Sequence, residues 1–392
     1  MDPRTGLPVV GMVGAGQLAR MTHQAAIALG QSLRVLAAHP DDGAALVAAD
    51  VHIGHHTDLD ALRAFAAGCD VVTFDHEHVP TEHLRTLAAE GVTVLPGPDA
   101  LLHAQDKQVM RERLSALGVP CPRWAPVSTV EDVAAFAGGA WPVVLKATRG
   151  GYDGRGVWVV SSAAEAAEVL DHGVPLIAEE CVPLVRELSA VVARSPYGQV
   201  AVWPVVETVQ QDGICVEVLA PAPDLPEDRA LAAQELAIRI ATELDVVGVL
   251  AVELFETEDG LVVNELAMRP HNSGHWTIDG AVTSQFEQHL RAVLDYPLGA
   301  TAAVAPAVCM VNVLGGDPGG MRFDERLHHL FAAEPRAKVH LYGKAVRPGR
   351  KIGHVTVIGE DMAEVRERAR AAARWLTDGA PDHGTSELEE SA

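Results

Sequence analysis

Short apolar runs alternate with amphipathic segments over the first hundred residues. The run 9–13 predicts a buried strand, because such a strand needs no polar side. The mostly apolar runs 33–37, 71–74 and 93–95 predict further strands. Between them, apolar residues recur at helical spacing in the segments 17–29, 58–67 and 81–89. This order predicts a parallel sheet with helices on both faces.

The later pattern divides the remainder of an α/β chain. A helix is predicted from Pro98 to Leu117, because Gly118 and two prolines follow it. Further helices are predicted at 226–244 and 362–376, and C-terminal strands at 307–313, 338–342 and 354–358. We expect a Rossmann-like first domain over 1–97, a second over 98–300 with a strand-rich unit at 122–192, a small β-rich domain over 301–378 and a disordered tail over 379–392.

Composition narrows the class of protein. The net charge of −23 argues against a general nucleic-acid binder, whose surface is basic. No apolar run approaches membrane-spanning length and no signal peptide is recognisable, so we expect a cytoplasmic protein that does not bind membranes. The five cysteines lack metal-ligand spacing and are expected to be free and mostly buried, and the 18 histidines form no known metal motif.

The turn after the first strand, Gly14–Ala19, has the pattern G-x-G-x-x-A. One interpretation is nicotinamide dinucleotide binding. The acid that this needs after the second strand is poorly placed, because Asp41 comes only after Pro40. The alternative is a helix N-terminus that holds a phosphate through backbone amides, with Gln17 beside it.

A glycine-rich loop, Gly150–Gly156, follows an apolar strand that ends in Lys146. Glycines let a backbone approach a phosphate closely, and Lys146 and Arg155 add positive charge. A tight hairpin is the alternative when the loop is considered alone.

A second cluster lies more than a hundred residues further on. Glu253 ends one apolar strand and Glu265 ends the next, with Asn264 beside it. Oxygen ligands on adjacent strand ends suit Mg²⁺ bound to nucleotide phosphates, although two solvated acids would have the same pattern. The loop that follows is dense in specific polar groups, namely Arg269, His271, Asn272 and His275.

Two more segments complete a nucleotide and substrate site. Backbone groups near Glu180 and Val182 are placed to contact adenine, and Glu187 to accept ribose hydroxyls; an ordinary strand and turn is the alternative. The turn Arg347–His354 is basic in an acidic protein, which favours a substrate phosphate over a merely solvated turn.

Together these motifs resemble the ATP-grasp family, and within it the 5-(carboxyamino)imidazole ribonucleotide synthetases of de novo purine synthesis. The most specific matches are Gly14–Met21, Gly150–Gly156, Asn264–Thr277 and Arg347–His354. The resemblance implies a Rossmann-like domain, a mobile ATP-grasp lid and body, a small C-terminal domain and a homodimer. It also implies that ATP phosphorylates bicarbonate to carboxyphosphate, whose CO₂ is captured by the amine of 5-aminoimidazole ribonucleotide.

The resemblance implies a role for each matching residue. ATP would be held by Lys107, Lys146, Gly151, Tyr152, Asp153, Gly154, Arg155, Gly156, Val157, Glu179, Glu180, Cys181, Val182, Glu187, Gln210, Asn264 and Glu265. Mg²⁺ would be held by Glu253 and Glu265. The ribonucleotide would contact Gln17, Leu18, Glu77, His271, Asn272, Arg347, Arg350 and Lys351, and catalysis would rest on Lys146, Tyr152, Asp153 and Arg155.

One stretch departs from the family pattern. Relatives carry Glu-Phe-Glu-Asn where this chain has Asp75-His76-Glu77-His78, so Glu77 is retained but the neighbouring contacts are in doubt. Three other functions remain possible: another ATP-grasp carboxylate–amine ligase, a non-catalytic ligand sensor and an NAD-dependent oxidoreductase. The oxidoreductase leaves both carboxylates and the basic turn unexplained, and the two retained carboxylates disfavour the sensor.

Overall fold

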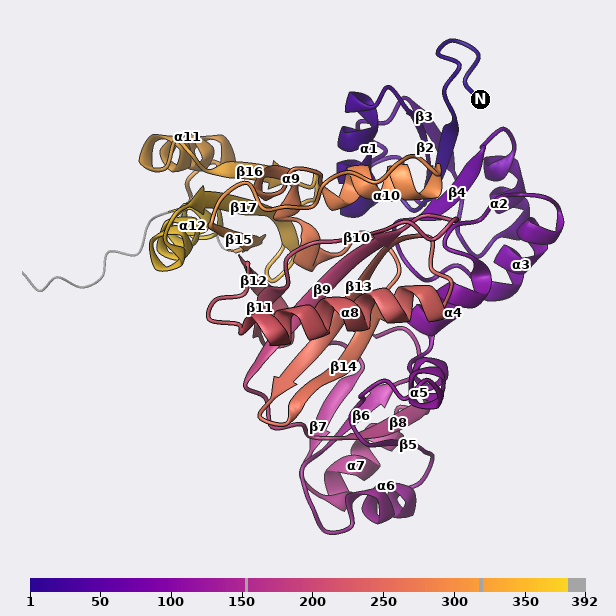
Figure 1. Cartoon of the computed structure of the whole chain (residues 1–392), viewed down its shortest axis with the longest axis vertical. Coiled ribbons are helices and arrows are strands. Elements are labelled where there is room, and N and C mark those ends of the chain that lie inside the picture. Colours follow the sequence, from indigo (N-terminus) through magenta and orange to yellow (C-terminus); the bar gives the residue numbers. More distant parts are fainter. Residues whose placement is uncertain (152–153, 317–319, 380–392) are drawn as a thin grey trace, which may run out of the picture.

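The computed structural model describes residues 1–151, 154–316 and 320–379. The first sheet along the chain is parallel (Figure 1). Its strands, in the spatial order β3-β2-β1-β4, are β1 (Val9–Val13), β2 (Ser32–Ala37), β3 (Asp50–Ile53) and β4 (Val71–Phe74). The helices between them are α1 (Gln17–Ala28), α2 (Leu59–Ala66) and α3 (Thr81–Ala89). The predicted parallel sheet is therefore confirmed.

One prediction for this region is wrong, and one strand was missed. The apolar run 93–95 forms only a single bridge, between Val94 and Val72. The edge strand β3 was not predicted, because its four residues are intermediate or exposed and include Asp50 and His52. An edge strand needs only one paired side, so it shows no continuous apolar run.

The predicted helix from Pro98 to Leu117 is two helices, α4 (Pro98–Gln105) and α5 (Lys107–Ala116). The break falls at Asp106, whose extended backbone ends α4 and whose carboxylate accepts hydrogen bonds from the backbone N–H groups of Gln108 and Val109. Asp106 is thus the N-cap of α5, a role that aspartate favours. The new helix begins with Lys107 at the site described below.

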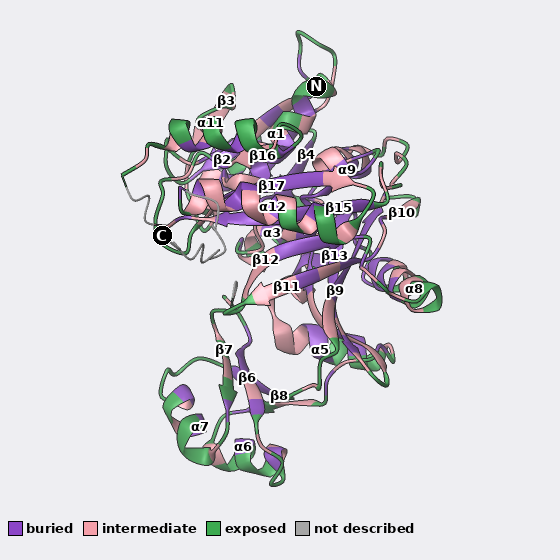
Figure 2. Ribbon diagram, turned by 90° about the vertical axis from the view of Figure 1, so that its left-hand side faces the viewer, coloured by how far each residue is buried: buried purple, intermediate pink, exposed green. Residues whose placement is uncertain are grey.

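A small antiparallel sheet forms a unit of its own at the foot of the molecule (Figures 1 and 2). Its strands, in the order β5-β8-β6-β7, are β5 (Trp124–Val127), β6 (Val143–Ala147), β7 (Val157–Val160) and β8 (Leu176–Glu180). Helices α6 (Val130–Ala137) and α7 (Ala163–Leu170) accompany it, and the apolar side chains form a separate core. We call this unit, Trp124–Glu180, the lid.

The predicted end of the lid near residue 192 is wrong, because β9 (Arg186–Arg194) pairs in the large antiparallel sheet. That sheet has the order β14-β13-β9-β11-β12-β15-β17-β16, with β10 beside β9. Its other strands are β10 (Val200–Val202), β11 (Val206–Gln211), β12 (Ile214–Ala220), β13 (Gly248–Thr257), β14 (Gly260–Ala267), β15 (Ala307–Leu314), β16 (Lys338–Leu341) and β17 (Lys351–Gly359).

The predicted small C-terminal domain has a core of its own, but its strands do not form a separate sheet. β15 pairs with β12 over four residues, so the C-terminal strands extend the body sheet without interruption. The helices of this half are α8 (Glu227–Glu243), α9 (Thr277–Gly280), α10 (Gln285–Val293), α11 (Phe323–Ala333) and α12 (Met362–Thr377), with a 3-10 turn at Asn272–Gly274. The basic turn before β17 therefore belongs to the same sheet as β13 and β14, the strands with Glu253 and Glu265.

The first domain and the body share one apolar core. Side chains of β4, α4, α5, β9, β13 and α8 belong to a single buried cluster. The buried imidazole of His289 on α10 crosses between the two parts: it contacts Thr73 Oγ1 on β4 at 2.7 Å and accepts from the Val249 N–H on β13 at 3.1 Å. Burial lowers the pKa of His289 to about 4, so it serves as a neutral hydrogen-bonding link.

Two predictions from composition can be compared with the structure. All five cysteines are free, but only Cys309 is buried, so the expectation that most would be buried is wrong. Among the described residues, no helix is both long and apolar enough to cross a membrane.

The predicted tail, apart from Gly379, lies outside the described residues, as do Tyr152 and Asp153.

Candidate active site

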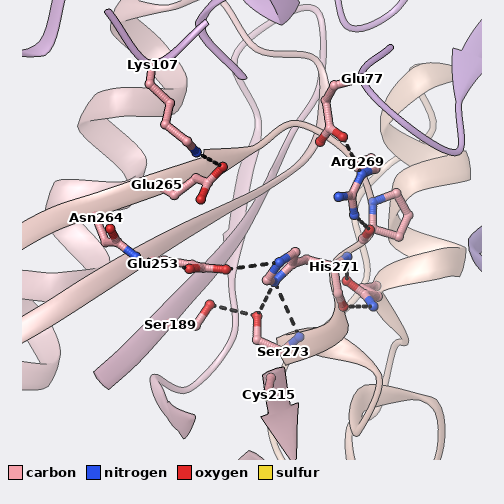
Figure 3. A network of polar contacts seen from close by, with 12 residues as sticks. Glu77, Lys107, Ser189, Cys215, Glu253, Asn264, Glu265, Arg269, His271 and Ser273 are labelled. Atoms are coloured by element: carbon pink, nitrogen blue, oxygen red, sulfur yellow. Dashed lines mark hydrogen bonds and ion pairs between the residues drawn. The ribbon is translucent and has the colours of Figure 1, made fainter. Parts of the chain in front are cut away.

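The two candidate metal carboxylates lie opposite each other in the β13–β14 hairpin. Glu253 and Glu265 are register partners, so their side chains project from the same face of the sheet (Figure 3). Lys107 Nζ lies 2.5 Å from Glu265 Oε1, and His271 Nε2 lies 3.2 Å from Glu253 Oε1. Two like charges directly opposite would destabilise the pair of strands, and the Lys107 ammonium offsets that repulsion.

The carboxylates fit a site completed by nucleotide phosphates. Within the described ranges, no three His, Cys, Asp or Glu residues converge as ligands for a metal ion. Mg²⁺ is commonly held by one or two carboxylates plus phosphate oxygens and waters, so a pair is sufficient. Asn264 Nδ2 lies 3.5 Å from Glu253 Oε2, which places a further polar group between the two strands.

Lys146 crosses from the lid to the body. Its Nζ donates to Asn264 Oδ1 on β14 at 2.9 Å and lies 2.7 Å from Glu179 Oε2 on the lid strand β8. Burial lowers the pKa of Lys146, whereas the Glu179 carboxylate acts in the opposite direction. A cation is therefore held next to the carboxylate pair, where phosphate charge would need neutralising.

Glu179 is an anchor for two cations. Its other oxygen lies 2.7 Å from Nε of Arg111, which is fully buried and also donates to the backbone carbonyls of Val263 and Asn264. Burial favours a raised pKa for Glu179, but Lys146 and Arg111 outweigh it and hold the pKa below its usual value. Arg111 thus joins α5, the lid and β14 at one point.

The segment proposed for the adenine and ribose is open. Glu180 and Cys181 are exposed and Val182 is half-buried, which leaves the connection between β8 and β9 accessible. Glu187 on β9 is half-buried, and burial together with the nearby Glu253 raises its pKa to about 7. Gln210 lies at a bulge between β11 and β12 and is also half-buried.

The polar loop after β14 is fixed by a buried glutamine. Gln285 on α10 accepts from the His271 N–H at 2.8 Å and donates to the His271 carbonyl at 2.7 Å. Its amide also lies 3.0 Å from His275 Nδ1, and the His271 ring contacts Ser273 Oγ at 2.9 Å. The backbone of His271 is therefore held on both sides, and its ring faces Glu253 (Figure 3).

The predicted phosphate site at the start of α1 is wrong for two backbone N–H groups, those of Gly16 and Ala19, which already have a partner in this chain. The Asp75 carboxylate accepts hydrogen bonds from the backbone N–H groups of Gly16 and Ala19. A Cβ at Gly14 would lie 2.7 Å from the Asp75 Cβ, and one at Gly16 would lie 2.7 Å from Asp75 Oδ2. The glycines of this turn therefore admit a carboxylate of the same chain, which also removes the basis for dinucleotide binding.

The residues assigned to the ribonucleotide come from the first domain, the loop after β14 and the turn before β17. The Arg269 guanidinium donates to Glu77 Oε2 at 2.7 Å, while Glu77 Oε1 is buried without a hydrogen-bond partner. Gln17 Oε1 accepts from Lys344 Nζ at 2.5 Å. Leu18 instead packs among Met21, Phe286 and Tyr342, so its side chain belongs to the core and only its backbone is left for the predicted substrate contact.

The basic turn lies on the same sheet as the carboxylate pair. Arg347 and Arg350 are exposed, and Lys351 begins β17. The turn is held by Gly315, whose N–H donates to the Arg350 carbonyl at 2.7 Å and whose carbonyl accepts from the Gly349 N–H at 2.9 Å. A Cβ at Gly315 would lie 2.2 Å from the Arg347 carbonyl oxygen, so this contact requires glycine.

Four residues of the site were missed by reasoning from sequence: Arg111, Gln285, Lys344 and the capping role of Asp75. Arg111 and Gln285 are single polar residues within helices, and nothing local marks them as buried. Lys344 had a signal, because it lies three residues before Arg347 and extends the basic turn.

Comparison with known proteins identifies the family. Family models match three consecutive parts of the chain: a ribonucleotide synthetase preATP-grasp domain at 7–105, an ATP-grasp domain at 112–286 and a phosphoribosylaminoimidazole carboxylase C-terminal domain at 308–368. An N5-carboxyaminoimidazole ribonucleotide synthase of Mycobacterium bovis is 64% identical over 95% of this chain and 88% of its own length. The chain belongs to the N5-carboxyaminoimidazole ribonucleotide synthase family.

Solved structures agree with the assignment to N5-carboxyaminoimidazole ribonucleotide synthases. The Thermus thermophilus synthetase is 40% identical, with a TM-score of 0.84 over 94% of this chain and 98% of its own. The Aspergillus clavatus synthase, solved with ADP and 5-aminoimidazole ribonucleotide, is 33% identical, with a TM-score of 0.86 over 94% of this chain and 98% of its own. The predicted fold, the ATP-grasp ligase class and ATP-dependent carboxylation in purine biosynthesis are confirmed.

Proposed function

We propose that this chain carboxylates the amine of 5-aminoimidazole ribonucleotide with bicarbonate, in two steps at the face of β13 and β14. ATP first transfers its γ-phosphoryl group to bicarbonate, giving carboxyphosphate and ADP. Carboxyphosphate then releases CO₂ and phosphate, and the amine captures CO₂ as a carbamate. The observation that carries the proposal is the paired Glu253 and Glu265, with Lys107 and Lys146 beside them.

The protein's part in the first step is to position phosphates and neutralise their charge, which is most of what phosphoryl transfer requires. Lys146, held by Asn264 and Glu179, would contact the phosphates, and Lys107 would exchange its contact with Glu265 for one with phosphate. The exposed connection after β8 would take the adenine, and Glu187 the ribose hydroxyls. The loop with Gly151, Gly154, Arg155 and Gly156 would cover the phosphates.

Glu253 and Glu265 would hold Mg²⁺, which supplies charge neutralisation for the bridging phosphate oxygens when bound. Their fit rests on the paired strand positions, on the Lys107 ammonium beside Glu265 and on the contact of His271 with Glu253. His271 would remain fixed through Gln285 while its ring exchanges partners.

The ribonucleotide would lie between the first domain and β17. Its 5′-phosphate would contact Arg350 and Lys351, with Lys344 and Gln17 beside them, and Glu77 Oε1 is a buried acceptor without a partner that suits a hydroxyl or amine donor. Asn272 has both carboxamide atoms buried without partners and fits the same role. The predicted roles of Tyr152 and Asp153 remain part of the proposal.

The activity test is release of ADP with each substrate omitted in turn. We expect rapid ADP release and carboxylated product only when ATP, bicarbonate, 5-aminoimidazole ribonucleotide and Mg²⁺ are all present. Rapid release with another acceptor amine or acid, and none with the ribonucleotide, would assign the chain to a different ATP-grasp ligase.

Arg350→Ala should raise the KM for the ribonucleotide about ten- to a hundredfold and change the KM for ATP little, because one charge-assisted hydrogen bond to phosphate is lost. Arg336→Ala is the control. This exposed arginine precedes β16 and lies at the end of the β16–β17 pair that is far from Lys351. A raised KM for ATP with an unchanged KM for the ribonucleotide would place the basic turn in the nucleotide site.

The predicted homodimer and cytoplasmic location belong to the same proposal. Both follow from the family resemblance and the composition, and sedimentation of the purified chain would test the first.

A further inference from the structure

The turn between β11 and β12, Gln211–Ile214, touches the glycine loop of the lid. A Cβ on Gly213 would lie 2.8 Å from the Gly154 Cα, and a Cβ on Gly154 would lie 3.2 Å from the Gly213 Cα. Two backbones therefore meet without side chains between them, one from the lid and one from the body sheet. Figure 2 shows the end of β11 above the lid strands β6 and β7.

The β11–β12 turn has a shape suited to this contact. The register of the two strands shifts at a bulge between Val209 and Gln210. Asp212 and Gly213 both have left-handed backbones, with φ of 52° and 75°. Aspartate adopts that conformation uncommonly, and such backbones and bulges concentrate at functional sites. The turn thus presents the Gly213 Cα and the Asp212 carbonyl to Gly154. A Cβ added to Gly154 would lie 3.4 Å from the Asp212 carbonyl oxygen.

The other side of the loop is packed as tightly. A Cβ on Gly151 would lie 2.8 Å from the Arg155 carbonyl oxygen, and one on Gly156 would lie 3.3 Å from Ala147 Cβ on β6. The backbone at Arg155 is therefore enclosed by the lid on one side, and Gly154 rests on the turn of the body on the other. A side chain at Gly213 would therefore displace Gly154 first.

We propose that Gly213 is a positioning residue: the β11–β12 turn is the seat on the body that sets the depth of the glycine loop over the phosphates. The inference rests on the proposed role of that loop in covering ATP and carboxyphosphate. A side chain at position 213 holds the loop away from the site and lets water reach carboxyphosphate. Water then converts carboxyphosphate to bicarbonate and inorganic phosphate, so ADP forms without carboxylated product.

The experiment compares Gly213→Ala with Gly198→Ala. Gly198 is in the turn between β9 and β10 of the same sheet, has φ of 82°, and would place a Cβ with nothing within 4 Å. Both substitutions impose the same left-handed strain, so the difference between them isolates the contact with Gly154. Gly213→Asn and Gly198→Asn repeat the comparison with a residue that tolerates this backbone.

We expect both Gly213 variants to lower kcat/KM for carboxylated product about tenfold or more and to raise the ratio of ADP to product severalfold. Both Gly198 variants should retain wild-type values, and thermal unfolding should shift equally at the two positions. Without nucleotide, hydrogen exchange at Gly154–Val157 should be faster in the Gly213 variants than in the wild type. That last measurement does not depend on activity.

The proposal is overturned if the Gly213 variants match the Gly198 variants both in the ratio of ADP to carboxylated product and in hydrogen exchange. A lower kcat/KM with an unchanged ratio of ADP to product also overturns it, because general loss of structure explains that result. Failure of the wild type to form carboxylated product would instead refute the proposed function, while the hydrogen-exchange comparison still decides whether the contact exists.

Discussion

Glu265→Gln should lower the rate of ADP release about a thousandfold while the protein stays folded. Glutamine has almost the same shape as glutamate but lacks the charge that would hold Mg²⁺ opposite Glu253. The substitution also removes the ionic partner of Lys107 in the nucleotide-free protein. Steady-state ADP release at saturating Mg²⁺ gives the rate, and circular dichroism gives the fold.

Glu258→Gln is the matched control for this prediction. Glu258 is exposed in the turn of the same β13–β14 hairpin, so the chemical change is the same and only the position differs. Its activity should equal that of the wild type. Near-normal ADP release by Glu265→Gln would remove this carboxylate from the metal site.

Glu179→Gln is expected to destabilise the protein by about 3–5 kcal/mol, because it leaves buried cations without their carboxylate. Arg111 is fully buried and Lys146 nearly so, and Glu179 contacts both at 2.7 Å. The thermal midpoint should fall by about 4–6 °C. Binding of ATP should weaken as well, because the pKa of Lys146 is already lowered by burial and would lose the carboxylate that opposes the shift.

Glu243→Gln is the control for stability. Glu243, at the end of α8, lies 3.9 Å from Arg113 at the surface, and Arg113 is on α5 like Arg111. Exposed pairs of this kind contribute about 0–1 kcal/mol, so the midpoint should move little. Equal midpoints for Glu179→Gln and Glu243→Gln would show that the Arg111–Glu179–Lys146 cluster does not anchor the lid.

Local patterns in the sequence were sufficient for much of the fold and for the chemistry of the site. Apolar runs located β1 and β4, because strands buried on both faces carry no polar side. β2 was located by its apolar residues, although Arg34 within it is only half-buried. The hairpin with Glu253 and Glu265 was predictable, because two strands joined by a short turn must bring their register partners together. The family resemblance added the nucleotide, the substrate and the order of domains.

Other features depended on contacts between distant segments. Asp75 occupies the start of α1, and no property of the turn Gly14–Ala19 distinguishes a carboxylate 56 to 59 residues away from a phosphate. Arg111 and Gln285 look like ordinary helix residues until packing buries them against β8, β14 and the loop after it.

The same reason explains the wrong end of the lid and the unforeseen continuity of the body sheet. Whether β9 joins the lid or the body, and whether β15 begins a new sheet or extends an old one, is decided by which strand edge it pairs with. A strand's apolar pattern records that it is buried and not what buries it. The sequence alone therefore determined the strands, the charged residues and the family, whereas the pairing of strands and the burial of single polar side chains were decided by the tertiary structure, because each depends on residues far apart in the chain.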